Sequence, residues 1–198
     1  TSLNALTAEL VGFSLSVESG EACYVPLGHK ETGDGTKVTD SNHTPDLFSP
    51  LPVACNLSPG QIPLAKAIAL IKPLLEDGSV LKIGHNMKYD MLVMQQHGIR
   101  IAPIDDTMLL SYCLHAGEHG QGMDELAERY LNYKTIRFDE VTGTGKNRLR
   151  FDEVDIEKAG AYAAEDADVT LRLWEHFKPQ VASARMLTQY ETIARPLA

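Results

Sequence analysis

Hydrophobic and polar residues in the first part of the chain follow the pattern of β-strands. The ranges 8–16 and 21–27 are rich in strand-forming residues and partly alternate, and a Ser-Gly turn separates them. This arrangement predicts a β-hairpin. The next range, 28–60, is polar and contains four prolines, which predicts a long loop.

From residue 61 onward, apolar residues recur at the spacing of amphipathic helices. This pattern predicts helices over 61–75, 87–97, 105–114, 122–131, 155–179 and 183–195. One short apolar strand, 80–84, directly precedes the second of them. Strands followed by helices, with one strand–helix unit between them, predict an α/β domain with a small mixed sheet.

Composition narrows the class of protein. The 198 residues fit one domain, and 43% hydrophobic residues are enough for a sizeable core. The net charge of −9 argues against a protein that coats duplex DNA, but it allows a site where metal ions hold phosphate. No apolar run approaches about 18 residues and no signal peptide precedes the strands, so we expect no membrane partner. Three widely spaced cysteines (Cys23, Cys55 and Cys113) favour a reducing cytoplasm.

A first candidate site lies where the predicted strand 80–84 meets the next helix, in the segment IGHNMKYD (83–90). Ligands of open α/β sheets bind at the carboxyl ends of strands, and the amides of a first helical turn bind phosphate. Asp90 lies in this first turn. A purely structural explanation is also open, in which Asn86 caps the helix and Asp90 complements its dipole.

A second candidate site lies on the long helix predicted over 155–179. Tyr162 and Asp166 are one turn apart and share a face. The same face continues through the apolar residues Val169, Leu173 and Phe177. A carboxylate on a buried stripe needs a partner that offsets the cost of burying its charge. For Asp166 this partner is either a metal ion or a basic side chain in a structural ion pair. Glu165 and Asp168 point elsewhere, and we expect both to face solvent.

Two further patterns are weaker. His115 and His119 have the i,i+4 spacing of a metal pair, but Gly117 and Gly120 interrupt any helix there, and a plain loop is the simpler interpretation. The segment GTGKN (143–147) lacks the spacing of a phosphate-binding loop.

Four segments carry a family resemblance, in the same order along the chain: 86–90 (NMKYD), 106–109 (DTML), 123–129 (MDELAER) and 162–168 (YAAEDAD). With them, the sequence resembles the 3′–5′ exonuclease domains of bacterial DNA polymerase I. The resemblance runs from about residue 3 to 196 and is weakest across 28–60. A tyrosine four residues before the last aspartate marks the tyrosine-bearing branch of the DEDD exonucleases. RNase D-like nucleases share the acidic pattern but are less similar over 106–112 and 134–138.

This resemblance implies an RNase H-like α/β fold, a mixed sheet flanked by helices. It also implies four carboxylates that hold two Mg²⁺ or Mn²⁺ ions for hydrolysis of the 3′-terminal phosphodiester. Asp90 corresponds to the second acidic position and Asp166 to the fourth, and Tyr162 corresponds to the hydroxyl that orients the attacking water. The substrate contacts implied for a single-stranded 3′ end of DNA are Leu3, His85, Asn86, Tyr89 and Phe138.

In relatives an Asp-x-Glu motif lies immediately before the position of Thr1, and this sequence starts just after that position. We therefore expect residues 1–198 to be one exonuclease domain of a larger enzyme that has a polymerase domain in the same polypeptide. With two carboxylates present, we expect weak metal binding, mutual repulsion that raises at least one carboxyl pKa, and little activity. The alternatives are a structural platform that has lost catalysis and an RNase D-like RNA exonuclease.

Overall fold

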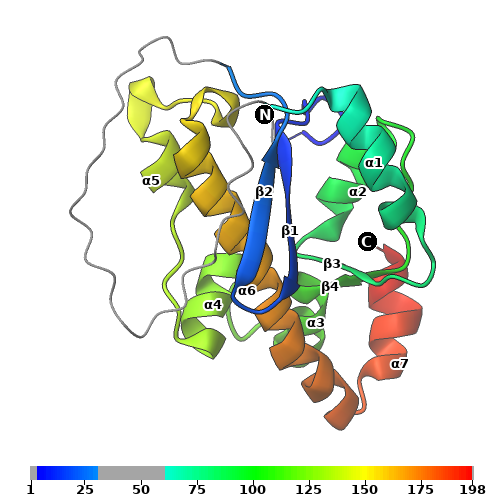
Figure 1. The fold of residues 1–198 in the computed structure, drawn as a ribbon. Coiled ribbons are helices and arrows are strands. Elements are labelled where there is room, and N and C mark those ends of the chain that lie inside the picture. The colour runs from blue at the N-terminus through cyan, green and yellow to red at the C-terminus, as the bar shows by residue number, and fades with distance from the viewer. Residues whose placement is uncertain (1–3, 31–60, 198) are drawn as a thin grey trace.

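The computed structural model describes residues 4–30 and 61–197, which form an α/β arrangement (Figure 1). Strands β1 (Gly12–Glu18) and β2 (Glu21–Pro26) pair antiparallel, so the predicted hairpin is confirmed. Gly20 has a φ of 89° at its turn, a conformation that favours glycine. The loop predicted over 28–60 falls mostly outside the described residues.

A second pair of strands departs from the prediction. Strand β3 (Lys82–Gly84) pairs in parallel with β4 (Ile104–Asp106), where the pattern had predicted the start of a helix. Strand β4 is short and has two aspartates, so nothing in its composition indicates a strand. Within the described residues the expected mixed sheet is therefore two separate two-stranded sheets.

Most of the predicted helices are present, with changed ends. The α-helices of the structure are α1 (Leu64–Glu76), α2 (Met87–Gln95), α3 (Thr107–His115), α4 (Met123–Leu131), α5 (Phe138–Thr142), α6 (Ile156–Ser183) and α7 (Leu187–Gln189). The short α5 was not predicted. Helix α6 continues past Pro179 and ends before Arg185, whose φ of 61° breaks the helix predicted over 183–195.

The long helix α6 is the centre of the packing. It crosses behind the β1–β2 hairpin in Figure 1 and also contacts α3 and α4. The predicted stripe of Val169, Leu173 and Phe177 is fully buried in the main core, where Leu110 of α3 and Leu126 of α4 join it. In the described ranges, no helix has both the length and the apolarity needed to cross a membrane.

A buried carboxylate joins β4 to the C-terminal part of the chain. Asp105 is fully buried and accepts hydrogen bonds from Trp174 Nε1 (2.8 Å), Lys178 Nζ (2.8 Å) and the Tyr190 hydroxyl (3.0 Å). Arg195 Nη1 lies 3.5 Å away. Burial alone raises the pKa of Asp105, but the hydrogen bonds from Lys178 and Trp174 outweigh it and hold the pKa below its usual range.

A buried histidine connects the hairpin to the segment before α6. His29 Nε2 lies 2.7 Å from the Tyr24 hydroxyl, and His29 Nδ1 lies 3.2 Å from the Val154 carbonyl. Burial lowers the pKa of His29, and the Val154 carbonyl, Asp152 and Asp155 offset only part of that effect. His29 is therefore neutral in the folded chain at neutral pH.

We expect this histidine to make the chain sensitive to mild acid. In the unfolded chain His29 takes up a proton near its ordinary pKa of about 6.5, whereas the folded chain resists protonation. The contribution of His29 to the free energy of unfolding should therefore fall as the pH drops below about 6.5. Urea unfolding of the unchanged chain and of His29→Gln at pH 7 and pH 5 isolates this contribution, because the stability of the unchanged chain relative to His29→Gln should be smaller at pH 5. His97→Ala is the control, and a stability difference between the unchanged chain and His29→Gln that does not change with pH would contradict this role.

Candidate active site

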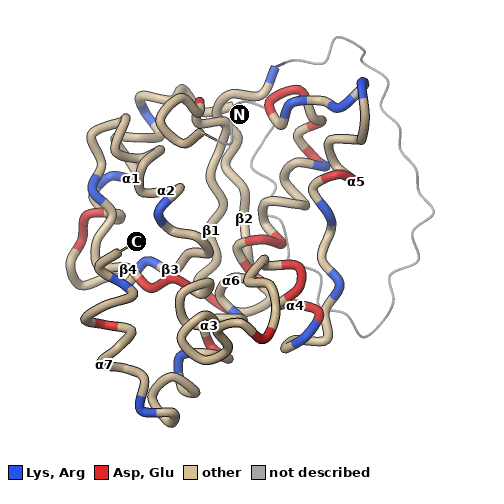
Figure 2. Tube along the Cα trace, turned by 180° about the vertical axis from the view of Figure 1, so that it is seen from behind, with Lys and Arg blue, Asp and Glu red and all other residues tan. Residues whose placement is uncertain are grey.

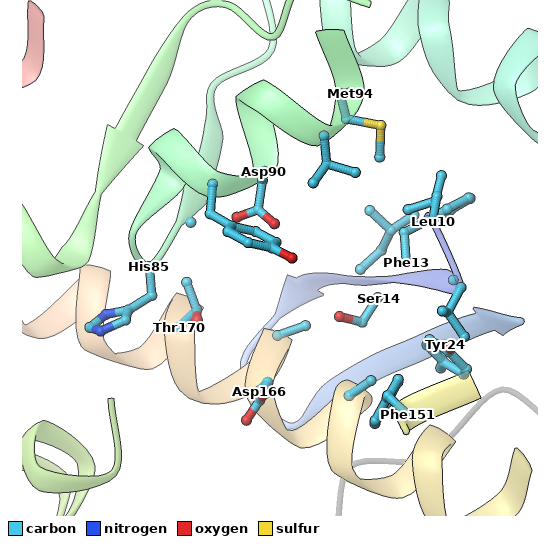
Figure 3. A pocket seen from close by; sticks show the side chains of 18 of the residues that line it. Leu10, Phe13, Ser14, Tyr24, His85, Asp90, Met94, Phe151, Asp166 and Thr170 are labelled. Carbon is cyan, nitrogen blue, oxygen red and sulfur yellow. The ribbon is translucent and has the colours of Figure 1, made fainter. Parts of the chain in front are cut away.

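A cavity of about 910 Å³ lies between the two sheets and α6. Its walls come from β1, from β3, from the first turns of α2 and from the middle of α6 (Figure 3). Asp90, Tyr162 and Asp166 all line it. The fold thus brings to one cavity residues that are 72 and 76 positions apart in the sequence.

The position of Asp90 is set by a second aspartate. Asn86 has a left-handed backbone (φ 61°) and makes no side-chain cap to α2, so the structural explanation by an Asn86 cap is wrong. Instead, Asp106 Oδ2 accepts from the Met87 amide at 2.8 Å and Asp106 Oδ1 from the Asn86 amide at 3.2 Å. The same carboxylate accepts from Met108 at the start of α3. Asp106 therefore fixes both helix starts.

Asp90 extends from α2 into the cavity (Figure 3) and is exposed there. Burial by the surrounding walls nevertheless raises the pKa of its carboxyl to about 6, and the negative charge of Asp106 adds to the rise. A concave wall explains both facts, because it leaves the side chain accessible while it removes most of the water around the carboxylate.

Asp166 lies on the opposite wall, on α6. Burial raises the pKa of its carboxyl to about 7, with additions from Glu165 and Asp124 that the Tyr162 hydroxyl partly opposes. Asp166 Oδ1 is buried and has no hydrogen-bond partner among the described residues. The expected rise in pKa is present at both aspartates, but its main cause is burial and not their mutual repulsion. In Figure 3 the Asp166 carboxylate is turned away from Asp90.

The hydroxyl of Tyr162 stays protonated. Burial raises its pKa, and the negative charge of Asp166 and a hydrogen bond with that carboxyl raise it further. Tyr162 also contacts Phe138 and Phe151, with ring centroids 5.8 and 6.0 Å away. These contacts hold the ring in place, with the hydroxyl proton directed to the Asp166 carboxyl and the hydroxyl oxygen available as an acceptor.

The neighbours of Asp166 differ from the prediction. Glu165 and Asp168 were expected to face solvent, but both are buried. Glu165 accepts from the Tyr133 hydroxyl at 2.7 Å and from the Ile136 amide at 2.6 Å. Asp168 accepts from the Gly20 amide at the hairpin turn. Helix α6 is covered on several sides. Its polar residues therefore form hydrogen bonds with neighbouring segments, although the periodicity of the sequence predicted that they face solvent.

The implied substrate contacts are distributed unevenly. His85, Tyr89 and Phe138 line the cavity, and His85 Nδ1 is fixed by Thr107 Oγ1 at 2.8 Å. Asn86 is exposed and is not a lining residue. Leu3 lies outside the described residues. The structure thus groups three of the five around the two aspartates.

Sequence reasoning missed two contributions to this site. Asp106 is buried and organises the helix starts, and an aspartate just before a helix is an N-cap signal that could have identified it. Arg148 and Arg150 line the cavity, and the Arg148 guanidinium lies over the Phe138 ring at 5.1 Å. Figure 2 shows basic residues along this part of the trace, beside α5. No spacing pattern in the sequence distinguishes these two arginines from ordinary charged residues of the surface.

Solved structures share this fold. NrnC from Brucella melitensis matches with a TM-score of 0.51 and 19% identity, over 67% of this chain and 59% of that one. The POL domain of Pol1 from M. smegmatis, in complex with DNA primer-template and dNTP, matches with a TM-score of 0.50 and 20% identity, over 64% of this chain and 19% of that one. The chain shares the fold of these proteins, and the expected RNase H-like α/β fold class is confirmed.

The sequence defines the family more closely. Residues 1–182 match the 3′–5′ exonuclease family model, and the chain belongs to this family. DNA polymerase I of Rhizobium leguminosarum is 45% identical over the whole chain, and that of Pseudomonas aeruginosa is 39% identical over 96% of it. The chain spans 19% of each of these polymerase sequences. It is a 3′–5′ exonuclease domain of the DNA polymerase I type, and hydrolytic nuclease activity is expected of this family, whose members generally depend on divalent metal ions.

Proposed function

We propose that this domain hydrolyses the 3′-terminal phosphodiester of single-stranded DNA, as a proofreading part of a DNA polymerase I. The observation that carries this proposal is the single cavity that Asp90, Tyr162 and Asp166 all line. Two carboxylates and a protonated hydroxyl at one site supply metal ligands and a group that orients water.

The residues present fit a hard divalent cation. Asp90 and Asp166 offer carboxylate oxygens, the ligands that Mg²⁺ and Mn²⁺ prefer. The partnerless Asp166 Oδ1 and the raised pKa values of both groups are features that a bound cation relieves. When bound, such ions polarise the phosphate and lower the pKa of a coordinated water.

The other side chains of the cavity act on substrate and water. The Tyr162 hydroxyl donates a hydrogen bond toward Asp166 and orients the attacking water beside it. Phe138 is 40% exposed and stacks the terminal base, while Arg148 and Arg150 face the phosphates. His85 and Tyr89 contact the strand near the scissile bond. Because the chain as a whole carries a charge of −9, binding depends on these local groups and on the metal ions.

We further propose that the cavity accommodates an additional strand that brings the remaining carboxylates. Among the described residues, β1 pairs only with β2 and β3 only with β4, and both β1 and β3 line the cavity. A strand between them satisfies the unpaired backbone groups of both edges. An Asp-x-Glu on that strand provides the two remaining carboxylates of a two-metal site.

Cleavage of a 5′-labelled single strand in Mg²⁺ tests these proposals. We expect the chain preceded by an Asp-x-Glu strand to shorten the DNA from its 3′ end, and the chain alone to be nearly inactive. Asp90→Asn, which keeps the size of the side chain, should abolish cleavage in the longer protein. A duplex with blunt ends and an RNA strand of the same sequence are the matched substrates.

Each outcome distinguishes between the alternatives. Comparable Mg²⁺-dependent rates with and without the added strand would show that the catalytic carboxylates are misassigned. Faster cleavage of RNA would favour the RNase D-like activity. No cleavage by the longer protein would favour a structural platform.

A further inference from the structure

We propose that His115, Glu118 and His119 form a binding site for one zinc ion, separate from the aspartate cavity. His115 is the last residue of α3, and the other two lie in the connection to α4. Each side chain offers one ligand atom, and these atoms all lie within 4.8 Å of one another. None of the three is among the residues that line the aspartate cavity.

His115 has a nitrogen that lacks a partner. Its Nδ1 lies 3.2 Å from Glu118 Oε2, whereas its Nε2 is buried and has no hydrogen-bond partner among the described residues. A buried polar atom without a partner costs free energy. A bound metal ion supplies the missing interaction, and the Tyr130 ring, stacked 5.2 Å from the imidazole, holds His115 in place.

His119 is oriented in the way that zinc ligands usually are. Its Nδ1 lies 2.6 Å from the Gly120 carbonyl, which can only accept, so Nδ1 carries the proton. Nε2 is therefore the unprotonated nitrogen, and it accepts a hydrogen bond from the Tyr130 hydroxyl at 2.7 Å that a zinc ion would displace. Zinc-binding histidines typically donate their second ring nitrogen to a carbonyl or carboxylate, and His119 has this arrangement before any ion is bound.

The donor set selects zinc over the ions expected in the aspartate cavity. Two imidazoles and one carboxylate, with a water as fourth ligand, suit zinc, whereas Mg²⁺ prefers oxygen ligands alone. Binding requires the three ligand atoms to come closer together. Glu118 is 65% exposed and moves at little cost, and Gly117 (φ +80°) and Gly120 flank the segment and leave it adaptable.

Zinc at this site would tie the end of α3 to the connection that leads into α4. Helix α4 begins at Met123, which lines the aspartate cavity and accepts a hydrogen bond from Thr170 Oγ1 at 3.4 Å. We therefore expect zinc to raise the thermal stability of the chain, because it binds the folded state selectively.

Zinc binding by the full chain, measured in competition with a chromophoric chelator, tests the inference. Millimolar Mg²⁺ is present throughout to occupy the aspartate cavity. We expect one zinc ion per chain and a rise in Tm. His119→Ala should weaken binding by at least about 100-fold and Glu118→Gln by about 10–100-fold, the range seen when groups around a zinc site are removed. His97→Ala, a histidine of α2's C-terminal end, is the matched control and should bind as the unchanged chain does.

Two results would overturn the site. One is a stoichiometry well below one zinc ion per chain in Mg²⁺. The other is unchanged affinity in both His119→Ala and Glu118→Gln. If His119→Ala fails to fold, as judged by circular dichroism, Glu118→Gln decides alone, because its exposed side chain keeps its size. Cobalt(II) in place of zinc gives an absorption spectrum that reports the coordination of the ion. A spectrum typical of tetrahedral nitrogen and oxygen ligands, which is lost in Glu118→Gln, supports the assignment.

Discussion

Replacing Asp166 with alanine is expected to remove 3′–5′ cleavage entirely, whereas Tyr162→Phe should only slow it. The Asp166 carboxylate is a proposed metal ligand whose Oδ1 has no hydrogen-bond partner among the described residues, so its loss removes the ion itself. The Tyr162 hydroxyl only positions water, a contribution of about 10²–10⁴-fold in rate. Both variants are made in the chain preceded by an Asp-x-Glu strand.

Metal affinity separates the two roles. Mn²⁺ binding, followed by electron paramagnetic resonance, should fall in Asp166→Ala and stay close to the original value in Tyr162→Phe. Glu128→Ala, an exposed acidic residue of α4, is the control for loss of negative charge. Equal losses of Mn²⁺ affinity in Asp166→Ala and Tyr162→Phe would show that the tyrosine is not confined to positioning water.

Asp105→Ala should produce a large loss of stability. Removing one partner of a buried ion pair typically costs about 3–5 kcal/mol. The side chains of Lys178 and Arg195 are 26% and 32% exposed and turn toward water when the carboxylate is absent. We therefore expect the free energy of unfolding, measured by urea unfolding, to fall by about 3 kcal/mol, near the lower end of this range.

An exposed pair provides the comparison. Asp139 lies 3.5 Å from Arg137, and both side chains are about half exposed, so Asp139→Ala should cost less than about 1 kcal/mol. If Asp105→Ala costs no more than this control, the buried network does not hold β4 against α6 and the C-terminal segment. Asp105→Asn keeps the shape and separates the loss of charge from the loss of packing.

The local pattern of the sequence determined the hairpin, most of the helices and the apolar stripe of α6. These depend on side-chain periodicity within one element, which the sequence displays directly. The resemblance added the family and predicted that Asp90, Tyr162 and Asp166 belong to one site. Periodicity by itself left both aspartates with a structural alternative, because a helix-start acid and a buried acid have several uses.

Only the tertiary structure decided which side chains meet. The three residues of β4 became a strand because they pair with β3, an interaction between distant segments that no local pattern encodes. Glu165 and Asp168 are buried because the 133–136 segment and the hairpin turn cover α6. Asp106 caps helix α2, which starts 19 residues earlier in the chain. The grouping of His115, Glu118 and His119 likewise depends on how the chain turns after α3, since spacing alone had favoured a plain loop.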